Sequence, residues 1–399
     1  MNRLIVVGAG PAGLSLALQL ARAGQAVTLL EARRDFSRSL RGDALMPCGQ
    51  EALARMGLLH SLEALPQRPL QDWQIWLEGR QLFAVAEPLG ALRPCQLVPQ
   101  QALLEALLAQ AMALPAFQWQ PGVGVSGLHH HGGRVRGVQL SDGGALEADL
   151  VIACDGRDSS LRQAAGLKLH TRGQALELLW FQLPGAAGPP EGFLTLVGGG
   201  AIASACRGAR GELQLGWLLR PGDAMAPRSP QAWAEAFAAL APPELAALLR
   251  QQGAGLSRPQ RLRVQVGLAT PWQRPGLLLL GDAAHPMSPI RAQGINMALR
   301  DSLVAAQELL GALEQGEGQG GEPRRARLDA ACRRIEALRR PEIVRVQSLQ
   351  LAEARQGHWI GYNPLLRHGL ALAAPLLGPL ARAVWTARQK PLREGTVWL

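Results

Sequence analysis

The sequence of 399 residues is poor in paired cysteines, in lysine and in long apolar runs. Its five cysteines are scattered without a C-x-x-C pair, which argues for a reducing compartment and against a zinc site or a disulfide framework. The segment nearest to a transmembrane span, residues 364–385, is interrupted by arginine, histidine and proline. Basic residues form no tract with interleaved aromatic residues, so we expect no nucleic-acid partner.

The formal net charge of +10 comes almost entirely from arginine. Lys168 and Lys390 are the only lysines, so 39 of the 41 basic residues are arginine (41 − 2). This preference for arginine is typical of a biased genomic base composition. Binding to an anionic membrane surface or to an acidic substrate is an alternative explanation for the positive charge. Residues 364–385 predict either a helix pair packed on the body or an amphipathic segment on a membrane surface.

The N-terminal residues 1–34 predict a buried strand, a glycine-rich turn, a helix and a second strand. The turn is a G-x-G-x-x-G, in which Gly8 makes the tight turn, Gly10 admits a pyrophosphate and Gly13 lets helix and strand pack closely. The N–H groups at the start of the helix are free to bind phosphate. Glu31 lies 18 residues past Gly13 (31 − 13), where a carboxylate binds ribose hydroxyls, which favours FAD or NAD over NADP.

Two alternatives to this interpretation are disfavoured. The same glycine pattern occurs at residues 122–127 and 316–321, but neither copy stands between a strand and a helix. A secretory signal would use Arg3 as its charged region and residues 21–23 as its cleavage site, and cleavage there would discard the whole turn.

Two further motifs stand at the ends of predicted strands. In residues 148–166 a buried strand ends at Asp155-Gly156, and the serines that follow can cap a helix. In residues 277–301 an apolar strand ends at Gly281-Asp282, which places a carboxylate where it can accept a ribityl hydroxyl. Gly294-Ile295-Asn296 then opens a helix whose N–H groups would face the negative charge that develops along a reduced flavin.

The rest of the chain alternates between predicted strands and helices. We expect strands within residues 70–86, 124–128, 134–140, 145–152, 176–183, 213–219, 262–266 and 277–280, and helices at 50–59, 99–113, 231–249, from 294 to before 316, and at 327–339 up to a break or kink at Pro341.

In this order and spacing, the three motifs resemble the single-component FAD-dependent aromatic hydroxylases, the para-hydroxybenzoate hydroxylase-like class A monooxygenases, over roughly residues 1–350. The resemblance implies an α/β fold with a Rossmann-type FAD-binding domain, an interleaved β-sheet substrate domain and C-terminal helices. The implied segments are 1–69, 96–175 and 266–345 for the FAD-binding domain, 70–95 and 176–265 for the substrate domain, and 346–399 for the helical region.

The resemblance also implies site residues. At the pyrophosphate and adenosine, the expected FAD contacts are Gly8, Gly10, Ala12 and Gly13, followed by Glu31 with Ala32 and Arg33 on the adenosine side. Arg41 is expected at the phosphate or ribityl chain, Gly281 and Asp282 at the ribityl chain, and Asp155 and Gly156 toward both FAD and NAD(P)H. At the flavin, the expected contacts are Gln96 and, beside the ring, Pro289, Gly294, Ile295 and Asn296. The candidate catalytic residues are Pro289, Arg291 and His285, and no metal is expected.

The sequence departs from the family pattern at several positions. Arg291 stands where members often have glycine, and its guanidinium could reach the reduced flavin, the substrate or solvent. Gln101 stands where the family usually has an arginine. His285 is either a titratable group near the flavin or a loop histidine with a structural hydrogen bond, and we favour the second interpretation. Tyr362 is the only tyrosine, so the tyrosine relay of phenol hydroxylases is missing and a larger apolar substrate, such as a polyketide, quinone or terpenoid, is favoured over a simple hydroxybenzoate.

The implied function is hydroxylation or epoxidation of such a small molecule with NADPH or NADH and O2, through a flavin C4a-hydroperoxide, by a cytoplasmic protein with or without peripheral membrane contact. Flavin halogenases are disfavoured, because the first 100 residues contain no lysine and WQIW at 73–76 does not match W-x-W-x-I-P. A geranylgeranyl-reductase-like enzyme, another reductase or oxidase of this fold, and a flavin-binding protein without oxygenase turnover remain alternatives.

Overall fold

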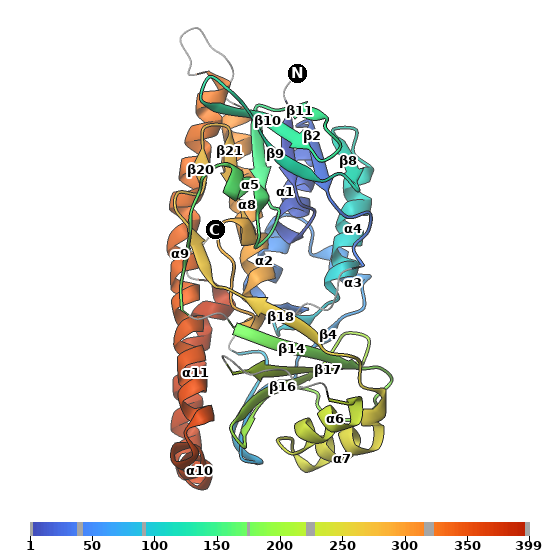
Figure 1. Ribbon diagram of the computed structural model, residues 1–399, viewed down its shortest axis with the longest axis vertical. Coiled ribbons are helices and arrows are strands. Elements are labelled where there is room, and N and C mark those ends of the chain that lie inside the picture. Colours follow the sequence, from blue (N-terminus) through green and yellow to red (C-terminus); the bar gives the residue numbers. More distant parts are fainter. Residues whose placement is uncertain are drawn as a thin grey trace.

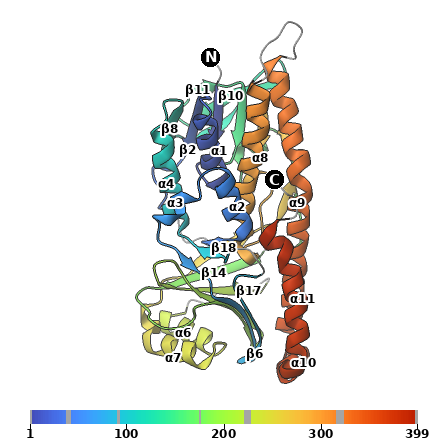
Figure 2. The same ribbon diagram turned by 180° about the vertical axis from the view of Figure 1, so that it is seen from behind.

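The computed structural model describes residues 3–37, 43–89, 93–173, 176–220, 228–314 and 323–395. The molecule is elongated, with one large sheet toward each end and the helix α9 (Arg324–Tyr362) running along its side (Figures 1 and 2). The predicted FAD contact Arg41 and the predicted loop 316–321 lie outside the described residues.

A six-stranded, mostly parallel sheet forms the upper end in Figure 1. Its order is β20 (Gln273–Arg274), β21 (Leu277–Leu279), β12 (Leu150–Ala153), β1 (Leu4–Val7), β2 (Val27–Glu31) and β8 (Phe117–Pro121). The central strand β1 pairs in parallel with β2 and β12, and all four of its residues are buried. Burial on both faces explains why it is a continuous apolar run rather than an alternating one.

A seven-stranded sheet forms the other end. Its order is β18 (Gln260–Val264), β14 (Leu176–Leu183), β17 (Leu213–Leu219), β16 (Ala201–Arg207), β15 (Phe193–Gly198), β5 (Asp72–Leu77) and β6 (Arg80–Ala86). Alternate side chains serve its two faces, as the strand period of two requires. In β14, Leu179 and Phe181 pack against α6 (Pro230–Ala238) and α7 (Pro243–Gln252), whereas Leu178 and Trp180 face a cavity.

Smaller sheets and helices complete the fold. The smaller sheets are β11 (Ala145–Glu147), β10 (Arg134–Leu140) and β9 (Val125–His131); β3 (Ala44–Leu45), β7 (Gln96–Leu97) and β4 (Arg68–Pro69); and β13 (Leu169–Thr171) with β19 (Gly267–Ala269). The other helices are α1 (Pro11–Arg22), α2 (Pro47–Arg55), α3 (His60–Glu63), α4 (Gln100–Met112), α5 (Ser160–Ala164), α8 (Gln293–Glu314), α10 (Pro364–Leu372) and α11 (Ala374–Glu394), with short 3-10 turns at Gly253–Gly255, Gly281–Ala283 and Ile290–Ala292.

Three predicted elements differ from the structure. The predicted strand 145–152 is two strands, because β11 pairs with β10 while β12 enters the six-stranded sheet. The predicted helix 231–249 is interrupted at Pro242 and Pro243, which lack the N–H that a continuous helix needs.

Of the two outcomes predicted at Pro341, a break or a kink, the break is wrong, because α9 continues through Pro341 to Tyr362. Arg339 and Glu342, on either side of the proline, are fully buried and form ion pairs. Tertiary contacts therefore hold the helix where local sequence favours a break.

The C-terminal helices α10 and α11 form a pair bent by 101°. Among the described residues, no single helix is long and apolar enough to cross a membrane, and only this bent pair passes that test jointly, by length and composition. Helix α11 packs on β6, where a Cβ on Gly378 would come within 2.5 Å of the Leu82 carbonyl oxygen.

Candidate functional site

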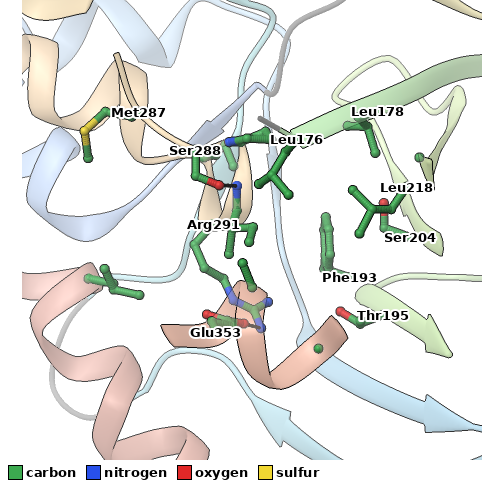
Figure 3. A pocket seen from close by; sticks show the side chains of 18 of the residues that line it. Leu176, Leu178, Phe193, Thr195, Ser204, Leu218, Met287, Ser288, Arg291 and Glu353 are labelled. Carbon is green, nitrogen blue, oxygen red and sulfur yellow. Dashed lines mark hydrogen bonds and ion pairs between the residues drawn. The ribbon is translucent and has the colours of Figure 1, made fainter. Parts of the chain in front are cut away.

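A cavity of about 1210 Å³ joins the predicted FAD motifs to the seven-stranded sheet. One part of its wall comes from Gly10, Ala12, Gly156, Asp282 and Gly294, that is, from all three motifs. The opposite part is formed by apolar side chains of β14 to β17 and by α9 and α11. Figure 3 shows leucines and Phe193 of the sheet facing the loop that carries Ser288 and Arg291.

The glycine-rich turn has the geometry that a bound pyrophosphate needs. Gly8 has a φ of 101°, and a Cβ on Gly13 would lie 2.0 Å from the Gly8 carbonyl oxygen, so both positions exclude side chains. A Cβ on Gly10 would meet no atom within 4 Å, so the space in front of α1 is open. The first helical bond runs from Leu14 N–H to the Gly10 carbonyl, which leaves the preceding N–H groups at the helix end for an anion.

Glu31 lies at the end of β2, as predicted, and its carboxylate binds backbone N–H groups. It accepts from Ala9 N–H at 2.8 Å and from Arg33 N–H at 3.1 Å. These bonds fix the carboxylate between the glycine turn and the loop after β2. Glu31, Ala32 and Arg33 do not line the cavity, so their contacts on the adenosine side stay predictions.

The second motif has a structural acid and an open glycine. Asp155 accepts hydrogen bonds from the Ser159 hydroxyl at 2.6 Å and from Leu161 N–H at 3.1 Å, so its carboxylate holds the start of α5. Gly156, with a φ of 89°, lines the cavity and has open space at its Cβ position.

The next residue, Arg157, was missed by sequence reasoning. It lines the cavity and donates from Nε to Asp282 Oδ2 at 3.0 Å. The only sequence signal was its place directly after the Asp-Gly pair.

The third motif rests on a buried ionic cluster, defined here as His285, Arg300, Asp301, Arg339 and Glu342. Asp301 accepts from Gly281 N–H at 3.3 Å and lies 2.7 Å from His285 Nε2 and 2.8 Å from Arg339 Nε. Burial by itself raises the pKa of Asp301, but His285 and Arg339 outweigh burial and lower the pKa below its ordinary value of 3.8. The cluster therefore ties the Gly281-Asp282 turn to α8 and α9.

His285 does not line the cavity. Its side chain is 1% exposed, and its ring lies 5.0 Å from that of Trp272. These surroundings support the structural interpretation that the sequence favoured over a catalytic role.

The first residues of α8 have two kinds of surroundings: some line the cavity, and one makes hydrogen bonds within the protein. Gly294 and Ile295 line the cavity together with Asp282 and Pro289, and their contacts with the flavin stay predictions. Asn296 does not line it: its side chain accepts from Met46 N–H at 2.8 Å and donates to the Ala292 carbonyl at 2.8 Å. The side chain of Asn296 therefore fixes β3 and the start of α2 against the Ile290–Ala292 turn.

Gln96 is a predicted flavin contact, whereas Asp43 and Gln100 are cavity residues that the sequence analysis missed. The Gln96 Oε1 atom is buried and has no hydrogen-bond partner among the described residues, yet the side chain does not line the cavity, so its flavin contact stays a prediction. Gln100 and Asp43 do line the cavity. Burial raises the pKa of Asp43 to about 6, against hydrogen bonds from Gln214 and from Gln100 N–H that lower the pKa.

Comparisons with known proteins agree with this geometry. The family model described as "FAD binding domain" matches residues 2–334 of the chain. The chain belongs to this FAD-binding family.

This FAD-binding chain is also similar to characterised enzymes. It is 35% identical to 6-methylpretetramide 4-monooxygenase of Streptomyces rimosus, over 88% of this chain and 83% of that protein. It is 28% identical to 3-demethoxyubiquinol 3-hydroxylase of Escherichia coli K12, over 81% of this chain and 83% of that protein. The protein is an FAD-dependent monooxygenase.

A solved structure shows the same fold. The crystal structure of Pseudomonas aeruginosa PqsL with 2-aminobenzoylacetate matches with a TM-score of 0.77 at 21% identity, over 93% of this chain and 99% of that chain. The predicted α/β, para-hydroxybenzoate hydroxylase-like fold class is thereby confirmed.

The residues present fit FAD. The open Gly10 position, the glycines at 156 and 281 with positive φ, and the carboxylate of Asp282 lie along one cavity wall. When bound, FAD supplies the redox and oxygen chemistry, and the protein supplies position and a water-poor wall.

Proposed function

We propose that this monooxygenase uses NADPH or NADH and O2 to hydroxylate or epoxidise a large aromatic molecule of the polyketide or quinone type. The observation that carries the proposal is the continuity of the cavity from the FAD motifs to the apolar face of the seven-stranded sheet. The names of the two relatives, a 6-methylpretetramide 4-monooxygenase and a 3-demethoxyubiquinol 3-hydroxylase, support the same substrate class.

The proposed roles of the residues follow from their positions. Gly10 and Ala12 bind the FAD pyrophosphate, while Gly13, which does not line the cavity, lets α1 pack closely against the turn. Asp282 binds the ribityl chain, and Gly294 and Ile295 face the flavin pyrimidine. Leu178, Leu218 and Phe193 hold the substrate against the ring and keep water from the reacting atoms (Figure 3). In the balanced reaction NAD(P)H supplies two electrons, one oxygen atom enters the product, and the other leaves as water.

Isotope labelling tests this function. We would incubate the FAD-loaded protein with NADPH or NADH, ¹⁸O₂ and a panel of polycyclic hydroxyaromatics and hydroxyquinones, and analyse products by mass spectrometry. We expect one ¹⁸O atom per product molecule and faster NAD(P)H oxidation in the presence of the substrate.

Two results would support a rival instead. Substrate reduction or dehydrogenation without ¹⁸O in the product would indicate a reductase or oxidase of the same fold. If NAD(P)H does not reduce the bound FAD in the presence of any compound of the panel, the protein is a flavin-binding protein without oxygenase turnover.

A peripheral contact with an anionic membrane is also proposed, through an apolar tip formed by α10 and α11. The tip exposes Leu365 (87%), Leu376 (84%), Leu372 (68%) and Leu380 (64%). Leu380 also lines the cavity, so the exposed apolar surface is continuous with the substrate site. Exposed apolar patches of this kind mark interaction surfaces, and the exposed Arg382, two residues after Leu380, complements anionic lipid.

Vesicle binding checks this contact. We expect the protein to sediment with vesicles of phosphatidylcholine and phosphatidylglycerol. The double variant Leu365→Ser, Leu376→Ser should lose at least about tenfold in vesicle affinity, because each leucine side chain contributes about 1.5–3 kcal/mol when it moves from water into the lipid. Leu338→Ser, an exposed leucine (45%) of α9, is the control and should bind as wild type does. No vesicle binding, combined with self-association that the double variant abolishes, would assign the tip to a second copy of the chain instead.

A further inference from the structure

Arg291 is a buried cation in the Ile290–Ala292 turn, which lies between the third predicted FAD motif and the apolar wall of the cavity. Its side chain is only 6% exposed and forms an ion pair with Glu353 of α9. Its guanidinium lies 4.9 Å from the ring centroid of Trp73 in β5 and 4.9 Å from that of Trp385 in α11. Two aromatic faces and one carboxylate therefore surround the cation where it borders the apolar wall of the cavity, and Figure 3 shows its contact with Glu353.

The backbone at this position is strained. Arg291 has a φ of 59° and Ala292 a φ of 49°, in the left-handed region that glycine adopts without penalty. Strain of about 1–3 kcal/mol per residue persists only where the surroundings enforce it, and it concentrates at functional sites. Gln350 helps to enforce it, since its Nε2 donates to the carbonyls of Ser288 at 3.0 Å and Ile290 at 2.7 Å.

The guanidinium is incompletely satisfied. Its Nε is buried and has no hydrogen-bond partner among the described residues, while its Nη2 donates a hydrogen bond to the Glu353 carboxylate. A buried donor without an acceptor is costly, and the cost falls when a ligand supplies an anionic oxygen. The partner Glu353 is 27% exposed, so its carboxylate can leave for solvent.

We propose that Arg291 binds an acidic hydroxyl of the aromatic substrate in its ionised form, as a phenolate or enolate, with Glu353 as its partner until the substrate enters. This inference rests on the proposed function. A cation beside the hydroxyl lowers the pKa of that group, so the hydroxyl releases its proton to solvent and the phenolate ring is electron-rich before oxygen transfer. Arg291 thereby does by charge what a tyrosine relay would do by proton transfer.

A fluorescent phenol tests the inference without turnover. We would titrate 7-hydroxycoumarin with pH in the FAD-loaded protein, without NAD(P)H, and follow the phenol and phenolate by their different excitation spectra. In wild type we expect the bound probe to ionise at least one pH unit below the free probe, a tenfold change in its ionisation constant. 7-Methoxycoumarin, which cannot ionise, should bind equally well to wild type and to the Arg291 variants.

The variants separate the role of Arg291 from a general effect of charge. Arg291→Gly adopts the same backbone without strain and should abolish the shift, whereas Arg291→Lys should retain part of it. Glu353→Gln should enlarge the shift by removing the competing carboxylate. Arg355→Gln removes an exposed cavity-lining cation and is the matched control, which should titrate as wild type does.

Three outcomes would overturn the inference: no binding of the probe to wild type, an unchanged shift in Arg291→Gly, or an equal loss in Arg355→Gln. Each is distinct from failure of the proposed function. A protein that incorporates ¹⁸O but gives no shift loses only the role of Arg291. A protein that gives the shift but incorporates no ¹⁸O loses the monooxygenase proposal.

Discussion

Replacing Gly10 with aspartate is expected to abolish FAD binding while leaving the fold intact. A Cβ at this position meets no protein atom within 4 Å, and the φ of −72° and ψ of −177° suit any residue. Aspartate is also a favourable residue at the position before a helix, where it can accept the free N–H groups of α1. The same carboxylate would occupy the anion site and repel the pyrophosphate.

The expected loss is on the order of 100-fold or more in FAD affinity, because each charge-assisted hydrogen bond to the pyrophosphate contributes about 1.5–3 kcal/mol. Flavin fluorescence on titration of the FAD-free protein measures the affinity, and thermal unfolding of the same protein measures the fold. The FAD-free melting temperature of Gly10→Asp should match or exceed that of wild type.

Gly13→Ala is the matched comparison within the same motif. Its Cβ would lie 2.0 Å from the Gly8 carbonyl oxygen, so α1 must move away from β1 and the FAD-free protein should be less stable. If Gly10→Asp instead retained FAD, or if it destabilised the FAD-free protein as Gly13→Ala does, the pyrophosphate would not lie where the open turn places it.

Local sequence was sufficient to predict the secondary structure around the glycine-rich turn. The strand, turn and helix of residues 4–22 and the carboxylate of Glu31 depend on contacts among near neighbours in one βαβ unit, and the structure confirms these elements. The same reasoning predicted a helix start at Gly294, and α8 begins one residue earlier, at Gln293.

The substrate end was beyond local sequence for a physical reason. The surroundings of Arg291 come from β5, α9 and α11, so Trp73, Glu353 and Trp385 meet only after the whole chain has folded. The sequence could mark Arg291 as a departure from glycine, but only the positive φ and the two tryptophan rings show what holds it there.

Tertiary packing also overruled helix propensity at Pro341. Its neighbours Arg339 and Glu342 belong to the buried ionic cluster, which joins α9 to Asp301 and Arg300 of α8. No local pattern distinguishes an arginine of this cluster from the many exposed arginines of the chain.

Removing one cation from the buried ionic cluster is expected to cost far more stability than removing an exposed one. Arg339→Met leaves Asp301 and Glu342 buried with fewer partners, and breaking a buried ion pair in this way typically costs about 3–5 kcal/mol. Urea unfolding of the FAD-free protein measures the change in the free energy of unfolding. Arg250→Met, which breaks an exposed pair with Glu235, should leave that free energy nearly unchanged.

The double variant Arg339→Met, Asp301→Asn decides where the cost arises. If it comes from the stranded carboxylate, neutralising Asp301 should recover part of the loss, so that the two substitutions are not additive. Because the pKa of Asp301 in the folded protein lies below 3.8, its stabilising contribution in wild type is fully present above that pH and is lost only as the pH falls through the lowered value. Additive losses, or an Arg339→Met variant as stable as wild type, would mean that apolar packing of α8 on α9, rather than the ionic cluster, holds the Gly281-Asp282 turn in place.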